Sequence, residues 1–306
     1  MLSRRRTYFT YFDSRYLLRG LALIASLREV GDWSPVIVVA LDEDVERFFK
    51  TVPVTGTTVI TLPEVECADP DLVAIKTGRS RVEYYFTLTS AIANFIMMSV
   101  PESSDQWLCY LDADLFFFSS PDGLFFKYAD ANILITPHGF SSNLMHLSEY
   151  GRFNVGFIAW RTNSAGRQCV FNYRERCIEW CFDRVEDGKF ADQRYLDAWP
   201  RDYAGVVELT SAPINVSYWN IGAFALTSEA EVLLLNNKQL IAWHFSGLVT
   251  RDHWNYGLSH CADEIRSRPE IMSTVYAPYV GKLRALFKVA AETIGFPRES
   301  SLGRLR

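Results

Sequence analysis

The chain has 306 residues, of which 49% are hydrophobic and 14% aromatic, and its formal net charge is −5. This length and apolar content suffice for one large α/β domain or two small ones with a well-filled core. The negative charge excludes a general nucleic-acid-binding protein, which would be basic. We therefore expect no nucleic-acid partner, although a metal ion can offset the charge of a phosphorylated small molecule.

Strand-like and helix-like segments alternate along the chain, which predicts an α/β fold with a mostly parallel central sheet and helices on both faces. In chain order the first predicted elements are a strand at 6–12, a helix at 15–30 capped by Asp13 and Ser14, a strand at 36–41, a helix at 45–50, a strand at 58–62, a polar loop at 63–80 and a helix at 81–98. After the strand that bears the acids of the run 107–118 come a helix at 122–128, a strand at 131–136, a loop at 137–152, a strand at 153–161, helices at 164–183 and 191–198, strands at 206–209 and 242–245 and a helix at 276–296. The simplest division is one domain at 1–265 with a C-terminal helical extension at 266–306.

The cysteines and the C-terminal helix bear on location. The six cysteines show no zinc-type C-x-x-C pairing, and structural free thiols fit a reducing compartment. We find no signal peptide and no apolar stretch long enough to span a bilayer, so we expect a cytoplasmic protein. In the C-terminal helix, apolar residues recur at helical spacing with basic residues among them. That helix either docks on the body of the protein, which we favour, or makes a peripheral membrane contact.

Two carboxylates, Asp112 and Asp114, follow one apolar run (WLCYL) and precede another (LFFF). The Asp-x-Asp spacing alone is uninformative, because it occurs at three places in this chain and about one occurrence is expected by chance. The pair at 42 and 44 opens a polar helix, where acids suit the N-terminus, and the pair at 69 and 71 flanks a proline in a predicted surface loop. Only the third pair lies between buried-strand patterns, where an unpaired charge is costly. We interpret it as a divalent-metal site that handles phosphates.

Four further motifs stand in order around this pair: TYFDSRY at 10–16, FNVGF at 153–157, DQRYL at 192–196 and HFSG at 244–247. Their order and spacing resemble the GT-A nucleotide-sugar glycosyltransferases, especially the retaining family 8 type that includes glycogenin and bacterial lipopolysaccharide galactosyltransferases. The resemblance covers most of residues 6–255. It implies a GT-A (Rossmann-like) fold, a catalytic domain at 1–265, and transfer of a hexose from a nucleotide sugar, expected to be UDP-linked, to a saccharide or glycolipid acceptor.

The resemblance implies a metal set of Asp112, Asp114 and His244. Two carboxylates and one imidazole favour Mn²⁺ over Mg²⁺, because Mg²⁺ prefers an all-oxygen shell. Mg²⁺ is the alternative. Such an ion disperses the charge that builds on a diphosphate leaving group. By periodicity alone, His244 is instead typical of a core histidine beside two aromatic residues. Gly247 would let a backbone N–H approach the phosphate closely.

At the phosphate end the chain departs from the family pattern, which continues to Lys-Pro-Trp. Here the sequence reads HFSGLVTRDHW. Arg251 is therefore the candidate for the diphosphate contact, since a guanidinium can bind phosphate bidentately.

Other matched positions line the donor. Thr10 would hydrogen-bond the base or ribose, and Tyr16 would stack on the base unless it simply packs on the sheet. Asn154 and Gly156 match the N-x-G of a strand beneath the donor sugar, where the amide reads a hydroxyl and the glycine leaves room for the ring. The alternative for Asn154 is a cap at a strand end.

The DQRYL motif bears on mechanism. Asp192 would hold sugar hydroxyls and Gln193 would support an oxocarbenium-like centre, unless Asp192 merely caps the short helix that follows. With retention, the departing phosphate oxygen can accept the proton of the acceptor, so no dedicated base is needed. An inverting enzyme needs a carboxylate base, for which Asp192 and Glu149 are the candidates.

These motifs predict a metal-dependent, retaining hexosyltransferase in surface-glycan (polysaccharide) assembly. One alternative is a sugar nucleotidyltransferase, which would carry an N-terminal Gly-rich, basic phosphate loop that this chain lacks. Another is a non-catalytic sugar-nucleotide- or glycan-binding protein, which would tolerate loss of Gln193 or of the metal set, yet both are present. The sequence does not decide where the acceptor binds, because the residue types in segments 137–146 and 215–220 are equally typical of sugar subsites and of loop packing.

Overall fold

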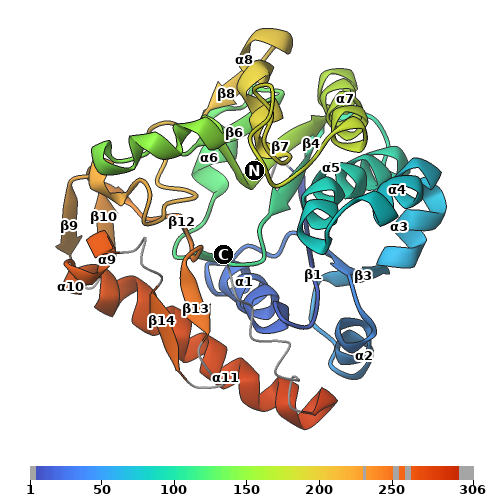
Figure 1. Cartoon of the computed structure of the whole chain (residues 1–306). Coiled ribbons are helices and arrows are strands. Elements are labelled where there is room, and N and C mark those ends of the chain that lie inside the picture. The colour runs from blue at the N-terminus through green and yellow to red at the C-terminus, as the bar shows by residue number, and fades with distance from the viewer. Residues whose placement is uncertain (1–4, 230–231, 251–254, 259–262, 296–306) are drawn as a thin grey trace. The chain divides into compact units, whose positions relative to one another are not determined.

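The computed structural model describes residues 5–229, 232–250, 255–258 and 263–295. A seven-stranded central sheet has the strand order β3-β2-β1-β4-β7-β6-β8 (Figure 1). Strand β1 runs parallel to β4 and β6 runs parallel to β8, whereas β7 is antiparallel to both β4 and β6. The predicted α/β fold with a mostly parallel sheet and a C-terminal helix is confirmed, with β7 as the exception.

The chain divides into two compact units. Unit 1 comprises Met1–Phe9, Ile60–Leu111 and Asp122–Thr210, and unit 2 comprises Thr10–Val59, Asp112–Pro121 and Ser211–Arg306. Strands β1 (Arg5–Phe12) and β3 (Thr57–Thr61) cross this division. The other elements of unit 1 are α3 (Leu62–Ala68), α4 (Pro70–Ile75), η1 (Lys76–Gly78), α5 (Arg81–Ser99), β4 (Ser103–Leu111), α6 (Asp122–Lys127), β6 (Ile133–Pro137), η2 (Ser142–Tyr150), β7 (Phe153–Thr162), α7 (Ser164–Glu179), η3 (Gln193–Ala198), α8 (Trp199–Asp202) and β8 (Val206–Glu208).

Unit 2 carries the remaining elements. They are α1 (Leu17–Glu29), β2 (Val36–Ala40), α2 (Glu43–Thr51), β5 (Leu115–Phe117), η4 (Ile221–Ala223), β9 (Leu226–Glu229), β10 (Val232–Leu235), β11 (Lys238–Gln239), β12 (Ala242–His244), β13 (Leu248–Thr250), β14 (Tyr256–Leu258), α9 (Asp263–Arg266), α10 (Pro269–Ile271), η6 (Met272–Tyr276) and α11 (Ala277–Ile294). Most of these bounds fall within a few residues of the predicted ones, but the small strands β5, β9–β11, β13 and β14 were not predicted.

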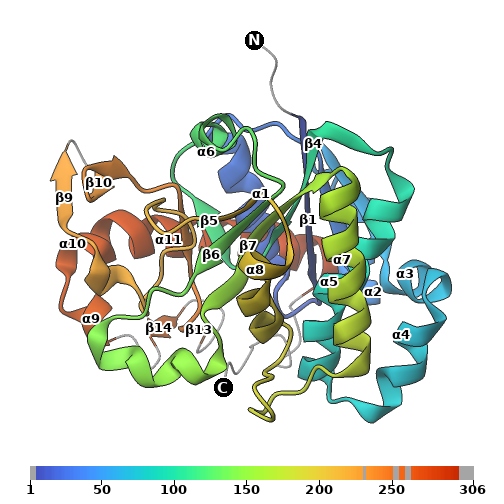
Figure 2. The same ribbon diagram turned by 90° about the horizontal axis from the view of Figure 1, so that it is seen from above.

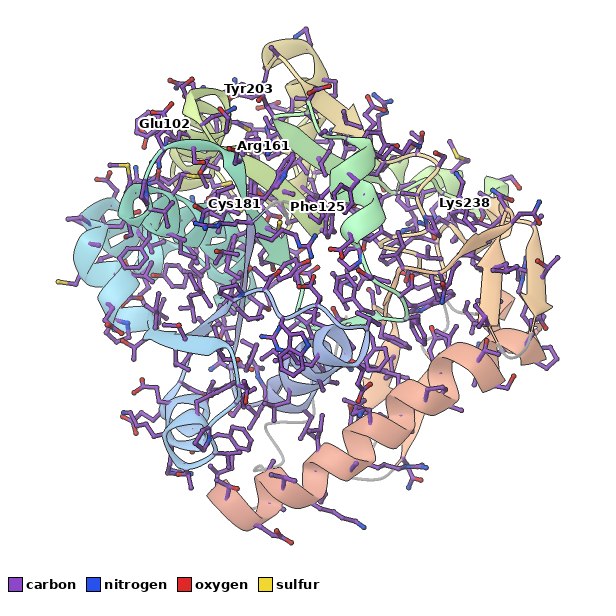
Figure 3. The ribbon with its side chains drawn as sticks, turned by 180° about the vertical axis from the view of Figure 1, so that it is seen from behind. Glu102, Phe125, Arg161, Cys181, Tyr203 and Lys238 are labelled. Carbon is purple, nitrogen blue, oxygen red and sulfur yellow. The ribbon has the colours of Figure 1, made fainter. Side chains whose placement is uncertain are left out.

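In unit 1, helices α5 and α7 lie side by side (Figure 2). A capping box starts α5, because the Ser80 hydroxyl accepts from the Glu83 N–H and the Glu83 carboxylate accepts from the Ser80 N–H. At the end of β7 the buried guanidinium of Arg161 donates to the carbonyls of Ala129, Ala131 and Ser104 (Figure 3). Backbone acceptors therefore compensate this buried charge.

The prediction of a polar loop at 63–80 is wrong. The segment forms α3, α4 and η1, because a capping box of Thr61 and Glu64 starts α3 and Asp69 accepts from the Leu72 N–H at 3.1 Å to start α4. Asp69 is also buried, and its carboxylate pairs with Arg174 of α7. Asp69 is thus a structural anion and not a surface-loop residue.

The predicted capping of the first helix is also wrong. Helix α1 begins at Leu17, and its N-cap residue, Tyr16, makes no side-chain capping bond. Asp13 instead accepts from the N–H of Arg15 at 3.1 Å and from its guanidinium. The carboxylate therefore stabilises the turn before the helix and not the helix end itself.

The C-terminal helix α11 packs within unit 2. The residues on its inner face, which are buried, are Tyr279, Leu283, Phe287 and Ala290. Tyr279 and Leu283 join a core cluster with Phe116, Phe245 and Leu248, and α11 lies against α1 (Figure 1). The protein itself thus covers the apolar face of α11, as the docking alternative expected. Across the described helices, none combines the length and the hydropathy that a membrane crossing requires.

Candidate metal centre

The acidic turn at 112–114 leads directly into β5, and strand pairing brings His244 to it. Strands β5 and β12 are antiparallel, with His244 opposite Leu115. The N–H of Leu115 donates to the Asp112 carbonyl at 3.0 Å, and the N–H of Phe245 donates to the Asp114 carbonyl at 2.9 Å. The backbone thereby fixes both ligand-bearing segments of unit 2 against each other.

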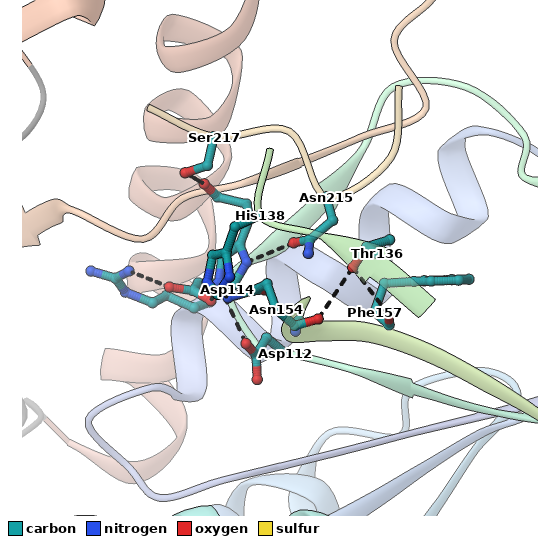
Figure 4. Close-up of polar contacts among 11 residues, drawn as sticks. Asp112, Asp114, Thr136, His138, Asn154, Phe157, Asn215 and Ser217 are labelled. Atoms are coloured by element: carbon teal, nitrogen blue, oxygen red, sulfur yellow. Dashed lines mark hydrogen bonds and ion pairs between the residues drawn. The ribbon is translucent and has the colours of Figure 1, made fainter. Parts of the chain in front are cut away.

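Three candidate ligand atoms, one from each residue of the expected metal set, converge here (Figure 4). Nε2 of His244 lies 3.1 Å from Oδ1 of Asp114 and 3.5 Å from Oδ2 of Asp112. Two donors at right angles on an octahedral cation lie about 3 Å apart, so these separations fit one Mn²⁺- or Mg²⁺-sized ion. Among the described residues, no other group of His, Cys, Asp and Glu side chains gathers in this way.

A cradle of backbone and amide groups orients His244. Its Nδ1 lies 2.8 Å from Oδ1 of Asn215, which is 0% exposed. The N–H of His244 donates to the Val216 carbonyl at 2.7 Å, and the Ser217 hydroxyl donates to the His244 carbonyl at 2.7 Å. Because the amide oxygen only accepts, Nδ1 carries a proton, which leaves Nε2 as the nitrogen that a metal ion beside the carboxylates could bind. His244 is buried, as the core-histidine alternative required, but its second nitrogen points at two acids.

Charge interactions within the trio shift the pKa values of its two buried residues, His244 and Asp114. Burial opposes the imidazolium form, but Asp114 and then Asp112 outweigh it, so the pKa of His244 is raised above its ordinary value. Burial likewise opposes the ionised form of Asp114, but His244 and Arg19 lower its pKa. In the metal-free protein the imidazolium form of His244 is therefore favoured more than it is in water, and a divalent cation would have to displace its proton.

Unit 2 also holds the predicted donor residues of the N-terminal motif. Thr10 is 1% exposed, and its hydroxyl has no hydrogen-bond partner in the described part of the chain. Tyr16 is half-buried, with the Arg19 guanidinium 5.0 Å from its ring centroid. Burial raises the pKa of Tyr16, and Asp114 adds to the shift while Arg19 opposes it. Gly247 has φ +84°, a conformation that favours glycine. Arg251 lies outside the described residues.

The strand motif FNVGF lies in unit 1. Oδ1 of Asn154 accepts from the N–H of Gly156 at 2.8 Å, and its Nδ2 is 3.3 Å from Nε2 of His138. Nδ1 of His138 is in turn 3.0 Å from the Gly151 carbonyl. Figure 4 draws this group beside Thr136, whose hydroxyl donates to the Asn154 carbonyl. The side chain of Asn154 thus accepts from a backbone N–H of its own strand and lies within hydrogen-bond distance of a histidine.

The DQRYL motif belongs to unit 1 as well. Asp192 is buried and accepts from the Tyr173 hydroxyl at 3.0 Å, and it makes no side-chain capping bond to η3. Gln193 is half-buried, and its amide donates to the Tyr150 carbonyl at 2.8 Å. Polar contacts therefore fix both side chains within unit 1. Helix capping does not account for Asp192.

Two residues of the metal centre escaped the sequence analysis. Asn215 was noted only as part of a loop; in the structure its φ is +58°, a conformation that asparagine adopts more readily than most residues, and the sequence held no other signal for it. Arg19 is a charge in the largely apolar stretch LLRGLALIASL, and it is 5% exposed. An arginine in a helix that is apolar nearly all round was the available signal for a buried cation.

Comparison with known proteins identifies the fold that carries this site. No model of a known protein family matches the chain. The uncharacterized proteins YfnF and YfnD of Bacillus subtilis (strain 168) are each 28% identical to it, YfnF over 78% of this chain and 80% of its own length and YfnD over 90% and 88%. A structure of the galactosyltransferase LgtC in complex with donor and acceptor sugar analogs has a TM-score of 0.54 over 96% of this chain and 98% of LgtC, at 14% identity. This chain has the GT-A fold. A structure of an active-site mutant of LgtC agrees, with a TM-score of 0.52, 14% identity and coverage of 90% and 99%.

Proposed function

We propose that this chain is a metal-dependent glycosyltransferase of the GT-A class that transfers a hexose from a UDP-linked sugar to a saccharide acceptor with retention. The observation that carries the proposal is the convergence of Asp112, Asp114 and His244 at separations of 3.1 Å and 3.5 Å. The fold shared with LgtC, a galactosyltransferase crystallised with donor and acceptor sugar analogs, supports the reaction class.

The ligand set suits a divalent cation that binds a diphosphate. Asp112 and Asp114 supply hard oxygen donors and His244 supplies a borderline nitrogen, a combination that favours Mn²⁺ over Mg²⁺. The cation supplies Lewis acidity toward the diphosphate leaving group. Asn215 keeps the lone pair of His244 Nε2 on the side of the carboxylates.

The remaining assigned residues bind the donor. We assign Thr10 and Tyr16 to the uridine, because the buried Thr10 hydroxyl is free to hydrogen-bond and the Tyr16 ring offers a stacking face. Gly247 and Arg251 are assigned to the diphosphate. In unit 1, the residues assigned to the donor sugar and its anomeric carbon are Asn154, Gly156, Asp192 and Gln193.

We propose retention from the family resemblance, and the assignment of Gln193 is compatible with it, because an amide cannot serve as the general base that inversion needs. In the proposed step the anomeric C–O bond to the diphosphate breaks, and its electron pair goes to the leaving oxygen. The acceptor hydroxyl forms the new bond on the same face, and its proton passes to the departing phosphate oxygen. Asp192 then holds sugar hydroxyls and does not remove a proton.

The cellular setting is part of the same proposal. The described cysteines are all free, which fits a cytoplasmic, reducing location. We propose a saccharide or glycolipid acceptor of surface-glycan assembly, with residues 1–265 as the catalytic domain and 266–306 as the C-terminal extension.

Nucleotide release tests the function directly. The purified chain is incubated with Mn²⁺ and each of UDP-glucose, UDP-galactose, UDP-GlcNAc and GDP-linked sugars, with and without a saccharide panel. We expect UDP release from one UDP sugar, abolished by EDTA, and an α-configured product by the anomeric ¹H coupling.

The chain supplies its own control. Asp114→Asn is expected to lower Mn²⁺ affinity more than ~100-fold. Asp44→Asn changes another Asp-x-Asp acid, one that pairs with Arg47 on α2, and should leave the affinity unchanged. Release of no nucleotide from any donor, or equal effects of the two variants, contradicts the proposal.

A further inference from the structure

Unit 1 contains a pocket whose walls carry mostly positive charge. Its volume is about 500 Å³, within the range of about 300–1,000 Å³ that is usual for small-molecule sites. Four cationic side chains from different segments line it: Arg176 of α7, Lys189 of the connection between α7 and η3, Arg194 of η3 and Arg201 of α8. Two carboxylates, those of Glu179 and Asp197, line it as well. Four cations against two carboxylates leave a surplus of two positive charges.

Neighbouring groups already engage one of the two carboxylates. Oδ1 of Asp197 accepts from the N–H of Arg152 at 2.8 Å, and its Oδ2 lies 3.5 Å from Nε of Arg194. Two of the cations are less engaged. Within the described residues, neither Arg176 nor Lys189 forms an ion pair, and Nζ of Lys189 lies 5.2 Å from the ring centroid of Trp180.

Other exposed cations of unit 1 are balanced by acids. Lys76 pairs with Glu66 at 2.6 Å, and Arg184 pairs with Glu186 at 2.6 Å. Ordinary surface pairing therefore does not describe the pocket. A concave wall that gathers charges of one sign focuses their potential on whatever enters it, and here that potential attracts an anion.

The chemistry of the walls indicates the class of anion. Guanidinium groups bind phosphate oxygens in a planar, bidentate way, and an ammonium group binds them as a point charge. A phosphate monoester carries a charge of about −1.5 to −2 at pH 7, which matches the surplus in the pocket. A phosphate ion alone would fill only a small part of the volume, so the ligand carries a further group.

That further group is polar. Apart from Gly188 and Ala198, every residue that lines the pocket is charged or carries a hydroxyl. Glu179 is exposed, and the hydroxyl of Tyr195 donates to the Trp180 carbonyl at 2.7 Å and keeps its acceptor lone pairs. Both groups can accept hydrogen bonds from the hydroxyls of a sugar, whereas an acyl chain or an aromatic base would find no apolar wall.

The pocket shares η3 with Gln193. Nη1 of Arg194 donates to the carbonyls of Ser148 at 3.0 Å and Glu149 at 3.1 Å. The amide of Gln193 donates to the next carbonyl, that of Tyr150, at 2.8 Å. Adjacent residues of η3 thus bind the same stretch of backbone, which places the pocket beside the DQRYL motif within unit 1.

We propose that this pocket is a second ligand site, which binds the phosphate group of a sugar phosphate through Arg176, Lys189 and Arg194. The inference goes beyond the proposed function, because it requires neither the metal centre nor glycosyl transfer.

Isothermal titration with glucose 1-phosphate in the presence of EDTA tests the inference. The wild type should bind glucose 1-phosphate without any divalent cation and should not bind glucose. For the double variant Arg176→Gln/Lys189→Gln we expect at least ~10-fold weaker binding, because two charge-assisted contacts are lost. Arg176 is exposed and Lys189 half-buried, so the core stays intact.

The double variant Arg81→Gln/Lys127→Gln is the matched control. It removes one arginine and one lysine that are exposed on α5 and α6 of unit 1 and do not line the pocket. The net charge changes equally, but the affinity for glucose 1-phosphate should equal that of the wild type. Equal losses in the two double variants would show general attraction by charge and overturn the site.

Vesicles of phosphatidylcholine with phosphatidylglycerol separate a sugar phosphate from a lipid headgroup. Cosedimentation of the wild type with these vesicles, without binding of glucose 1-phosphate, overturns the sugar-phosphate assignment. Binding of neither probe overturns the site as a whole. Nucleotide release from UDP sugars does not enter these measurements, so the proposed function and this inference can fail independently.

Discussion

Replacing Asn215 by glycine removes the acceptor of the His244 Nδ1–H and leaves the backbone unstrained. The φ of +58° at this position suits glycine at least as well as asparagine. The lost bond is 2.8 Å long and fully buried. The imidazole is then free to place its proton on Nε2, where two carboxylates accept it, and the lone pair for the metal is lost.

The magnitude follows from these contacts. A buried donor left without its acceptor costs about 1–3 kcal/mol. Loss of a group that orients a metal-bound histidine lowers metal affinity by about 10–100-fold, equivalent to about 1.4–2.7 kcal/mol. The range for metal affinity applies here, because the proton can move to Nε2, so we expect Mn²⁺ affinity to fall by about 10–100-fold in Asn215→Gly.

Isothermal titration of the purified variants with Mn²⁺ measures the effect. Asn237→Gly is the matched control, because Asn237 has φ +59° and is exposed in the β10–β11 turn, away from the ligands. Its Mn²⁺ affinity should match that of the wild type. Unchanged affinity in Asn215→Gly, or an equal loss in Asn237→Gly, would refute the assigned role of the amide.

Three further outcomes are expected. The pKa of His244 is raised in the metal-free protein, and the cation must displace the proton of this residue. Mn²⁺ affinity should therefore rise with pH, by up to ~10-fold per pH unit below that pKa. A Mn²⁺ affinity that stays constant between pH 6 and 8 contradicts this. Tyr279→Ala removes a fully buried ring whose centroid lies 3.7 Å from that of Phe245. It should lower the free energy of urea unfolding by about 3–5 kcal/mol, whereas Tyr279→Phe should change it by no more than about 1 kcal/mol. Equal losses would show that the hydroxyl, and not the ring, stabilises the core. Arg161→Met removes the donor to three carbonyls and should lower the free energy of unfolding by about 3 kcal/mol or more. The exposed control, Arg81→Met, should lower it by less than about 0.5 kcal/mol. A loss for Arg161→Met near that of the control would contradict a stabilising role of these buried hydrogen bonds.

The sequence predicts the elements whose patterns are local. Alternation of apolar runs with amphipathic segments gives the α/β sheet and the bounds of α5 and α11, because their periodicity and caps lie within a few residues of each other. The segment at 63–80 fails for the opposite reason. Its helices α3 and α4 are only seven and six residues long, and Asp69 pairs with Arg174, which no local pattern connects to it.

The candidate metal centre divides in the same way. Asp112, Asp114 and His244 were predicted from motif order, and the β5–β12 register explains how they meet. Arg19 and Asn215 were not predicted, because their partners, Asp114 and Leu248 for Arg19 and His244 for Asn215, are distant in the sequence. Only tertiary structure separates such residues from their neighbours.

The pairing of β5 with β12 has a consequence for how the centre assembles. The segment from Asp122 to Thr210 belongs to unit 1 and is inserted between these two strands of unit 2. During synthesis the acidic turn is made early, but it meets His244 only after the whole insertion has emerged. The proposed cation would therefore link the two ends of a long loop, and the entropic cost of closing such a loop grows only slowly with its length. We therefore expect Mn²⁺ binding at this site only after unit 2 has folded. A chain truncated before β12 should not bind Mn²⁺ there.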